Sequence, residues 1–135
     1  MSLFCNVNIG SDLTFDELSH DYNAIVLAYG ANKSRYLNVP NADAKNCISG
    51  GDFVSWYNGA PSSSAPLLDK EDVVIIGNGN VSIDCARILL SSIERLKTTD
   101  MPAYAVDSLK QSRVRNVRIF GRRGPVEVCL AFLLA

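Results

Sequence analysis

The segment that begins at residue 73 limits the possible folds of this chain more than any other. Four apolar, β-forming residues, 73–76, run directly into the turn Gly77-Asn78-Gly79-Asn80-Val81-Ser82. Apolar residues then recur at three- and four-residue steps as far as Leu96, which predicts one amphipathic helix. A strand, a turn of the form G-x-G-x-x followed by a small residue, and a helix begin a βαβ crossover. The sequence therefore predicts an α/β fold with a parallel sheet and a Rossmann-like dinucleotide-binding unit.

Each position of the turn has a physical role in such a unit. Gly77 permits the tight turn out of the strand, Gly79 lets a pyrophosphate approach the backbone, and Ser82 lets helix and strand pack closely. The phosphates would bind the N–H groups at the start of the helix, where the helix dipole favours an anion. Glycine-rich turns also occur for geometry alone, but the flanking strand and helix favour dinucleotide binding. The candidate cofactor-binding residues are Gly77, Asn78, Gly79, Asn80 and Val81.

A second predicted strand indicates which dinucleotide would bind. Residues 116–120 are predicted to form a strand that ends at Gly121, and Arg122-Arg123 follow it with no acidic residue before Glu127. NAD-binding units place an acidic residue there to hold the ribose 2′-hydroxyl, whereas a 2′-phosphate requires arginine. A guanidinium can bind a phosphate through two hydrogen bonds, and a carboxylate would repel it. The pair Arg122-Arg123 therefore predicts NADP(H).

The arginine pair lies far along the chain from the glycine turn. Gly79 and Arg122 are separated by about twice the usual spacing of ~20 residues, and we expect a helix over about 100–111 to absorb the excess. The alternative is that Arg122 and Arg123 are solvated turn residues of a basic stretch that docks an acidic protein or a polyanion. The other members of this stretch are Lys110, Arg113, Arg115 and Arg118. We rank phosphate binding first because only the pair lies at the end of the strand, and we expect Arg118 to face water.

The N-terminal part of the chain, residues 1–31, carries weaker patterns. Alternating residues predict a short strand over 4–9. Thr14 and Glu17 have the spacing of a capping box, which predicts a short helix that begins there. The apolar run 24–29 predicts a strand that is buried on both faces of a parallel sheet.

The rest of the chain divides into three further segments. Residues 32–70 are predicted to form a linker with a short helix over 51–58. Residues 71–128 hold the predicted NADP-binding βαβ unit, and 129–135 form an apolar tail. Residues 1–31 are predicted to form a strand-helix-strand segment.

Composition excludes several classes of function. The formal net charge of −1 gives no general attraction to nucleic acid, and we predict no nucleic-acid partner. The four cysteines form no CxxC pair and the chain has one histidine, which excludes a zinc site and a redox dithiol and favours a reducing, intracellular compartment. The longest apolar run is far shorter than the ~20 residues of a membrane span, and we expect neither a transmembrane segment nor a targeting peptide.

Prominent single side chains have structural interpretations. We expect Trp56 and Tyr57 to serve packing rather than flavin stacking. Cys85 belongs to the apolar series of the predicted helix and is expected to be a buried hydrophobic residue. His20 lies beside Asp21 at a helix end, and no catalytic triad can be assembled around it.

Beyond these single motifs, a set of segments covers nearly all of the chain up to about Val128. The segments are 6–10, 24–31, 56–59, 77–90, 109–114 and 121–126. Together they resemble the central part of the adrenodoxin reductase family, the mitochondrial FAD-containing NADPH:ferredoxin reductases. In that family the turn matching 78–81 and the pair matching Arg122-Arg123 bind NADP(H).

The resemblance implies an electron path. The family passes a hydride from NADPH to FAD and then single electrons to a small [2Fe-2S] ferredoxin. It therefore implies an acidic ferredoxin or adrenodoxin as the partner, and a location in the mitochondrial matrix or at the inner membrane.

The resemblance also limits what this chain is expected to do alone. The family's FAD-binding segments lie outside the resembling region, so we do not expect FAD to bind this chain stably or the chain to turn over NADPH. The resemblance also implies that residues 1–31 belong to the flavin-domain side of the protein. We expect the parallel sheet to be incomplete. The alternative is a truncated, non-catalytic fragment that binds a nucleotide or a partner.

Overall fold

The structure is a computed structural model that describes residues 2–30, 37–61 and 63–122. The chain divides into two compact units, Met1–Lys33 and Ser34–Ala135. Arg123 and the predicted tail, 129–135, lie outside the described residues.

Helix α1, Phe15–Asp21, is the regular element of the first unit's described part. The Thr14 Oγ1 accepts from the Glu17 backbone N–H at 3.2 Å, and the Glu17 carboxylate accepts from the Thr14 N–H at 2.8 Å. These bonds satisfy backbone groups that a helix N-terminus leaves unpaired, and they confirm the predicted capping box. The hydrogen bonds from the backbone and then the hydroxyl of Thr14 lower the pKa of Glu17.

The two strands predicted in this unit are wrong. Residues 4–9 form no strand, and only a single bridge joins Ile9 to Leu13. Residues 24–29 also form no strand, and Val26 is 88% exposed instead of buried. An apolar run becomes a strand only when a neighbour pairs with its backbone, and the described part of this unit supplies no such neighbour.

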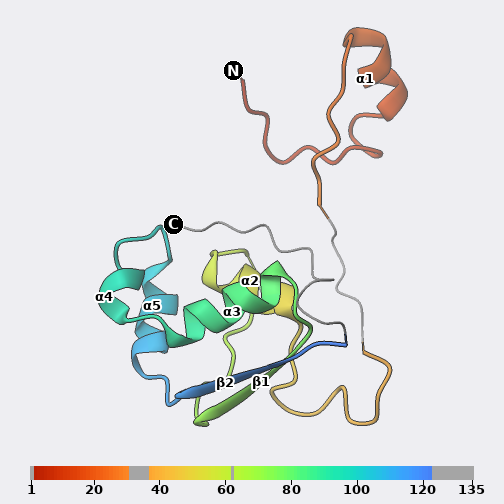
Figure 1. The fold of residues 1–135 in the computed structure, drawn as a ribbon. Coiled ribbons are helices and arrows are strands. Elements are labelled where there is room, and N and C mark those ends of the chain that lie inside the picture. Colours follow the sequence, from red (N-terminus) through yellow and green to blue (C-terminus); the bar gives the residue numbers. More distant parts are fainter. Residues whose placement is uncertain (1, 31–36, 62, 123–135) are drawn as a thin grey trace. The chain divides into compact units, whose positions relative to one another are not determined.

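The second unit has the predicted α/β composition. Its elements in order are α2 Gly50–Tyr57, β1 Asp72–Ile76, α3 Asn80–Leu90, α4 Ile93–Leu96, α5 Ala103–Lys110 and β2 Asn116–Phe120. The helix predicted over 51–58 is therefore confirmed as α2, and the helix expected near 100–111 as α5. Figure 1 shows helices α2–α5 on one side of strands β1 and β2.

Strands β1 and β2 pair in parallel, with a register that runs from Asp72 opposite Asn116 to Ile76 opposite Phe120. The Gly77 N–H continues this ladder and donates to the Phe120 carbonyl at 2.7 Å. Parallel strands need a crossover connection, which α3, α4 and α5 provide here. The predicted βαβ unit is confirmed.

The crossover is not the single helix that the apolar pattern predicts up to Leu96. Helix α3 ends at Ser91, which has an extended backbone (φ −70°, ψ 147°) and donates its hydroxyl to the Arg87 carbonyl at 2.6 Å. Ser92 then caps α4 by accepting from the Arg95 N–H. Serine hydroxyls compete for backbone groups and so favour helix ends over interiors. The apolar spacing continues across the break because both helices face the same core.

The core of this unit lies among the helices and against one face of the sheet. It is formed by Phe53, Trp56, Tyr57, Cys85, Ile88, Leu96, Ala105 and Leu109. Trp56 is 1% exposed, and the Tyr104 hydroxyl donates to its carbonyl at 2.8 Å, which joins α5 to α2. The packing roles predicted for Trp56, Tyr57 and Cys85 are confirmed.

The other face of the sheet is exposed. Val73 and Ile75 are half-buried on the helix side, whereas Ile76 is 67% exposed, so the described residues cover only one face of β1, in agreement with the incomplete sheet that the sequence analysis expects. Parallel strands are usually continuous apolar runs because both faces of the sheet are covered. In this sheet, the described residues cover only one face. Arg118 also differs from expectation: it pairs with Asp72 on the neighbouring strand at 2.9 Å rather than only facing water.

Leu96→Ala should destabilise the second unit by about 2–5 kcal/mol, because Leu96 is 1% exposed and its removal leaves a cavity. Leu90→Ala is the matched control, since Leu90 is exposed near the end of α3. Urea unfolding followed by circular dichroism measures both. Equal losses of stability would contradict the assigned core.

Candidate functional site

The glycine turn begins with a residue that must be glycine for two reasons. Gly77 has a φ of +118°, a conformation that side chains rarely adopt. A Cβ there would also lie 3.3 Å from the Ser82 Oγ. The tight turn and the close packing predicted for Gly77 and Ser82 are therefore both present.

Neither of these reasons, a positive φ or a close neighbour, applies to Gly79. Its φ of −85° suits any residue, and a Cβ at Gly79 would meet nothing within 4 Å. It is the N-cap of α3, where no side chain caps the helix and where the first turn, beginning at Asn80, holds no acidic residue. Gly79 and Asn80 are exposed, and the N-cap residue places no side chain of its own over the positive end of the α3 helix dipole. This geometry suits an anion.

The pairing of β1 with β2 brings the second candidate element, Arg122, close to this turn. Ile76 and Phe120 are paired partners, so the residues after β1 and after β2 emerge at the same edge. Gly121 contacts the Asn78 side chain closely, since a Cβ at Gly121 would overlap it. Arg122 follows directly and is exposed. The intervening α4 and α5 account for the long sequence separation, as expected.

A polar cluster that the sequence did not indicate joins α2 to α3. The Tyr57 hydroxyl donates to Asp84 Oδ2, while Arg87 donates to Asp84 Oδ1 from Nε at 2.9 Å and from Nη2 at 2.6 Å. The spacing of Asp84 and Arg87 on one helix is a recognisable signal for their ion pair. Tyr57 is distant in sequence, so only the packed helices reveal it.

The cluster shifts the pKa values of its members. Burial raises the pKa of Asp84, but the hydrogen bonds from Tyr57 and Arg87 and the charge of Arg87 outweigh it, and the net shift is downward. Burial, followed by the hydrogen bond to Asp84 and its charge, raises the pKa of Tyr57. Burial and then the Asp84 charge raise the pKa of the Cys85 thiol, which therefore stays neutral. A neutral, buried thiol has no nucleophilic role.

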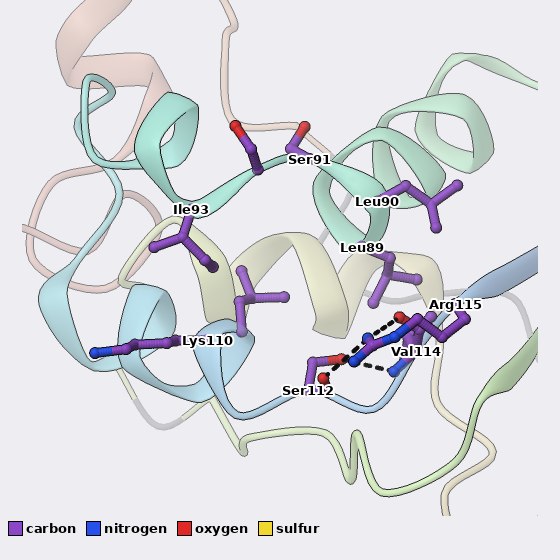
Figure 2. Close-up of a pocket in the computed structure, with 10 residues that line it drawn as sticks. Leu89, Leu90, Ser91, Ile93, Lys110, Ser112, Val114 and Arg115 are labelled. Atoms are coloured by element: carbon purple, nitrogen blue, oxygen red, sulfur yellow. Dashed lines mark hydrogen bonds between the residues drawn. The ribbon is translucent and has the colours of Figure 1, made fainter.

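A separate cavity lies at the other end of α3 from the glycine turn. It has a volume of about 380 Å³ and is shown in Figure 2. Its lining residues are Leu89, Leu90, Ser91, Ser92, Ile93, Leu109, Lys110, Ser112, Val114 and Arg115. Arg115 is folded back on the chain, where it donates to the Val114 carbonyl at 2.7 Å. None of the predicted site residues lines it, because α3 is 11 residues, or about 16 Å, long.

The described part of the chain has no group of three or more His, Cys, Asp or Glu residues that could hold a metal ion. No helix in that part of the chain is long and apolar enough to span a membrane.

The sequence matches a protein family over most of its length. The profile of the family "pyridine nucleotide-disulphide oxidoreductase" covers residues 6–115. The chain belongs to this family. The matched region contains the glycine turn and the helices of the crossover.

The curated relatives confirm the resemblance to adrenodoxin reductases. The chain is 48% identical to the mitochondrial NADPH:adrenodoxin oxidoreductase of Salvelinus fontinalis, over 91% of this chain and 25% of that protein. It is 45% identical to the human enzyme of the same name, over 91% of this chain and 26% of that protein. It is 41% identical to the NADPH-ferredoxin reductase FprA of Mycobacterium tuberculosis, over 96% of this chain and 29% of that protein. The chain therefore spans about a quarter of the length of these relatives.

A solved structure is similar in fold as well. Mycobacterium tuberculosis FprA in complex with NADPH is 42% identical and matches with a TM-score of 0.77, over 90% of this chain and 27% of that one. The predicted α/β fold class is thus shown by sequence, structure and comparison together.

Asp84→Asn should reduce stability at neutral pH but not at low pH. Because the folded-state pKa of Asp84 is below its unfolded value of about 3.9, the stabilisation is complete above that value and is lost as the pH falls through the folded-state pKa. The difference between the urea midpoints of the parent and the variant, measured from pH 7 to pH 3, should shrink as the pH falls. Asp107→Asn, at an exposed position of α5, is the control, and a pH-independent difference for Asp84→Asn would contradict the assignment.

Proposed function

We propose that the second unit binds NADP(H), with the pyrophosphate at Gly77, Asn78, Gly79, Asn80 and Val81. One observation carries this proposal: position 79 is a glycine, although its backbone conformation and its surroundings would both allow a side chain. A ligand that approaches the backbone closely gives a physical reason for glycine there. The uncapped start of α3 supplies N–H groups and a favourable dipole for that ligand's phosphates.

The arginines supply the preference for a 2′-phosphate. Arg122 is exposed beside the turn, at the shared edge where β1 and β2 end. We assign Arg122 and Arg123 to the 2′-phosphate of the adenosine ribose, because planar guanidinium groups bind phosphate through two hydrogen bonds. The contact between Gly121 and Asn78 supports this assignment, because it brings the residue before Arg122 close to the glycine turn.

For the whole protein, we propose an FAD-dependent NADPH:ferredoxin oxidoreductase. Several similar proteins are named as adrenodoxin or ferredoxin reductases, and a structural neighbour was solved with NADPH. In this reaction the bound NADPH supplies a hydride to FAD, and a [2Fe-2S] ferredoxin takes up electrons singly. The described residues contribute the binding and orientation of the nucleotide, and we assign none of them to FAD. A mitochondrial location is part of this proposal, since several relatives are named as mitochondrial.

Retention on an immobilised 2′,5′-ADP resin tests the cofactor assignment. The parent chain should be retained and eluted by free NADP⁺, and the variant Arg122→Ala/Arg123→Ala should pass through, because it lacks the cations for the 2′-phosphate. The control Lys110→Ala/Arg113→Ala removes two exposed cations of the same basic stretch and should be retained. If the control loses as much retention as the arginine variant, a general basic patch is responsible and the assignment is wrong.

Gly79→Ser should change stability and binding in opposite directions. The serine hydroxyl can cap α3 and should stabilise the unit by about a few tenths of a kcal/mol, because the position is open and already has N-cap geometry. The same hydroxyl occupies the place of the phosphate, so NADP⁺ affinity should fall about tenfold or more, the equivalent of one charge-assisted hydrogen bond. Thermal melting and calorimetric titration measure the two effects, and unchanged affinity would contradict the proposed site.

A further inference from the structure

Asn78 and Gly121 bring the two halves of the proposed site into close contact. A Cβ built on Gly121 would overlap the Asn78 side chain at its Cγ, Nδ2 and Cβ atoms. Real side-chain atoms do not approach one another so closely. Gly121 is outside the left-handed region of φ, so its backbone does not demand glycine. The reason for glycine at position 121 is therefore the space that the Asn78 side chain occupies.

The contact joins two elements that the chain connects only through the whole crossover. Asn78 lies in the turn that follows β1, and Gly121 follows β2. The two strands end together, with Ile76 opposite Phe120 and the Gly77 N–H bonded to the Phe120 carbonyl. The Asn78 side chain lies across this edge, on the residue directly before Arg122. It fixes the turn and the start of the arginine segment against each other.

We propose that the contact between Asn78 and Gly121 sets the preference of the site for NADP(H) over NAD(H). The inference rests on the proposed function, in which the turn holds the pyrophosphate and Arg122 the 2′-phosphate. The pyrophosphate and the 2′-phosphate are attached to the same ribose, which limits the distance between them, so both groups bind well only if the protein holds their two positions at a matching separation. Asn78 and Gly121 are positioning residues in this scheme, because they act through the groups on either side of them.

A side chain at position 121 would break this arrangement. The alanine methyl of Gly121→Ala cannot coexist with Asn78 in its present place, so the Asn78 side chain, the turn or the strand end must move and the contact is lost. The substitution should weaken mainly the interaction with the 2′-phosphate. The affinity for NADP⁺ should therefore fall more than the affinity for NAD⁺, which has no 2′-phosphate. A general disruption of folding would reduce both affinities alike.

A double-mutant cycle tests the inference on the full 135-residue chain. The dissociation constants of NADP⁺ and NAD⁺ are measured for the parent, Asn78→Ala, Gly121→Ala and Asn78→Ala/Gly121→Ala, with thermal melts of each. Each single variant should lower the ratio of NADP⁺ to NAD⁺ affinity about tenfold, and the double variant should lower it no further than a single one, because residues that act through one contact are not additive. Asn116→Ala, the same substitution at the exposed start of β2, should leave the ratio unchanged.

The outcomes separate this inference from the proposed function. If the parent chain shows no preference for NADP⁺, the proposed function fails. If the parent prefers NADP⁺ and both single variants keep that preference, or if their effects add in the double variant, only the role of the contact is overturned. If Gly121→Ala unfolds, the double variant should fold again, because Asn78→Ala vacates the space, and a double variant that stays unfolded would overturn the steric argument.

Discussion

The parallel pairing of β1 with β2 is the interaction on which the rest of the second unit depends. Parallel strands end at the same edge, so the turn after Ile76 and the segment after Phe120 become neighbours whatever lies between them. The backbone bond from Gly77 to Phe120 carries the pairing into the turn itself. The glycine turn and the segment that begins at Gly121, although separated by a long crossover in the sequence, therefore lie side by side at this edge. Helix α3 begins at the same place.

The helices hold this pairing from one side. Helices α2, α3, α4 and α5 bury a common set of apolar side chains, and Ile75 packs against that set from the sheet. The Tyr57, Asp84 and Arg87 cluster adds a polar connection between α2 and α3 at the rim of the core. The opposite face of the sheet carries exposed apolar side chains, including Phe120. The stability of the site therefore depends on the helical side.

The sequence was sufficient for features that depend on local chemistry. The capping box at Thr14, both strands of the crossover, and the turn at Gly77 follow from residue types and short spacings, and the structure contains them. The end of α3 was missed because the apolar spacing continues through Ser91 and hides the competition of its hydroxyl for the backbone. Residues 24–29 failed as a strand because pairing requires a neighbour, which no local pattern specifies.

The site itself was predictable only in part. The candidate glycines and arginines follow from the requirements of a phosphate, but the close approach of Asn78 to Gly121 depends on the register of two distant strands. The same is true of the hydrogen bond from Tyr57 to Asp84. Contacts between residues far apart in sequence need the folded backbone, whereas the turn chemistry does not.

Titration of the isotope-labelled chain with NADP⁺, followed by amide NMR shifts, tests the central claim most directly. The account predicts that the shifts concentrate at residues 77–82 and at Gly121 and the arginines that follow, at both ends of the proposed nucleotide site. Shifts confined to the cavity lined by Leu89, Lys110 and Arg115, or no saturable shifts at all, would contradict it.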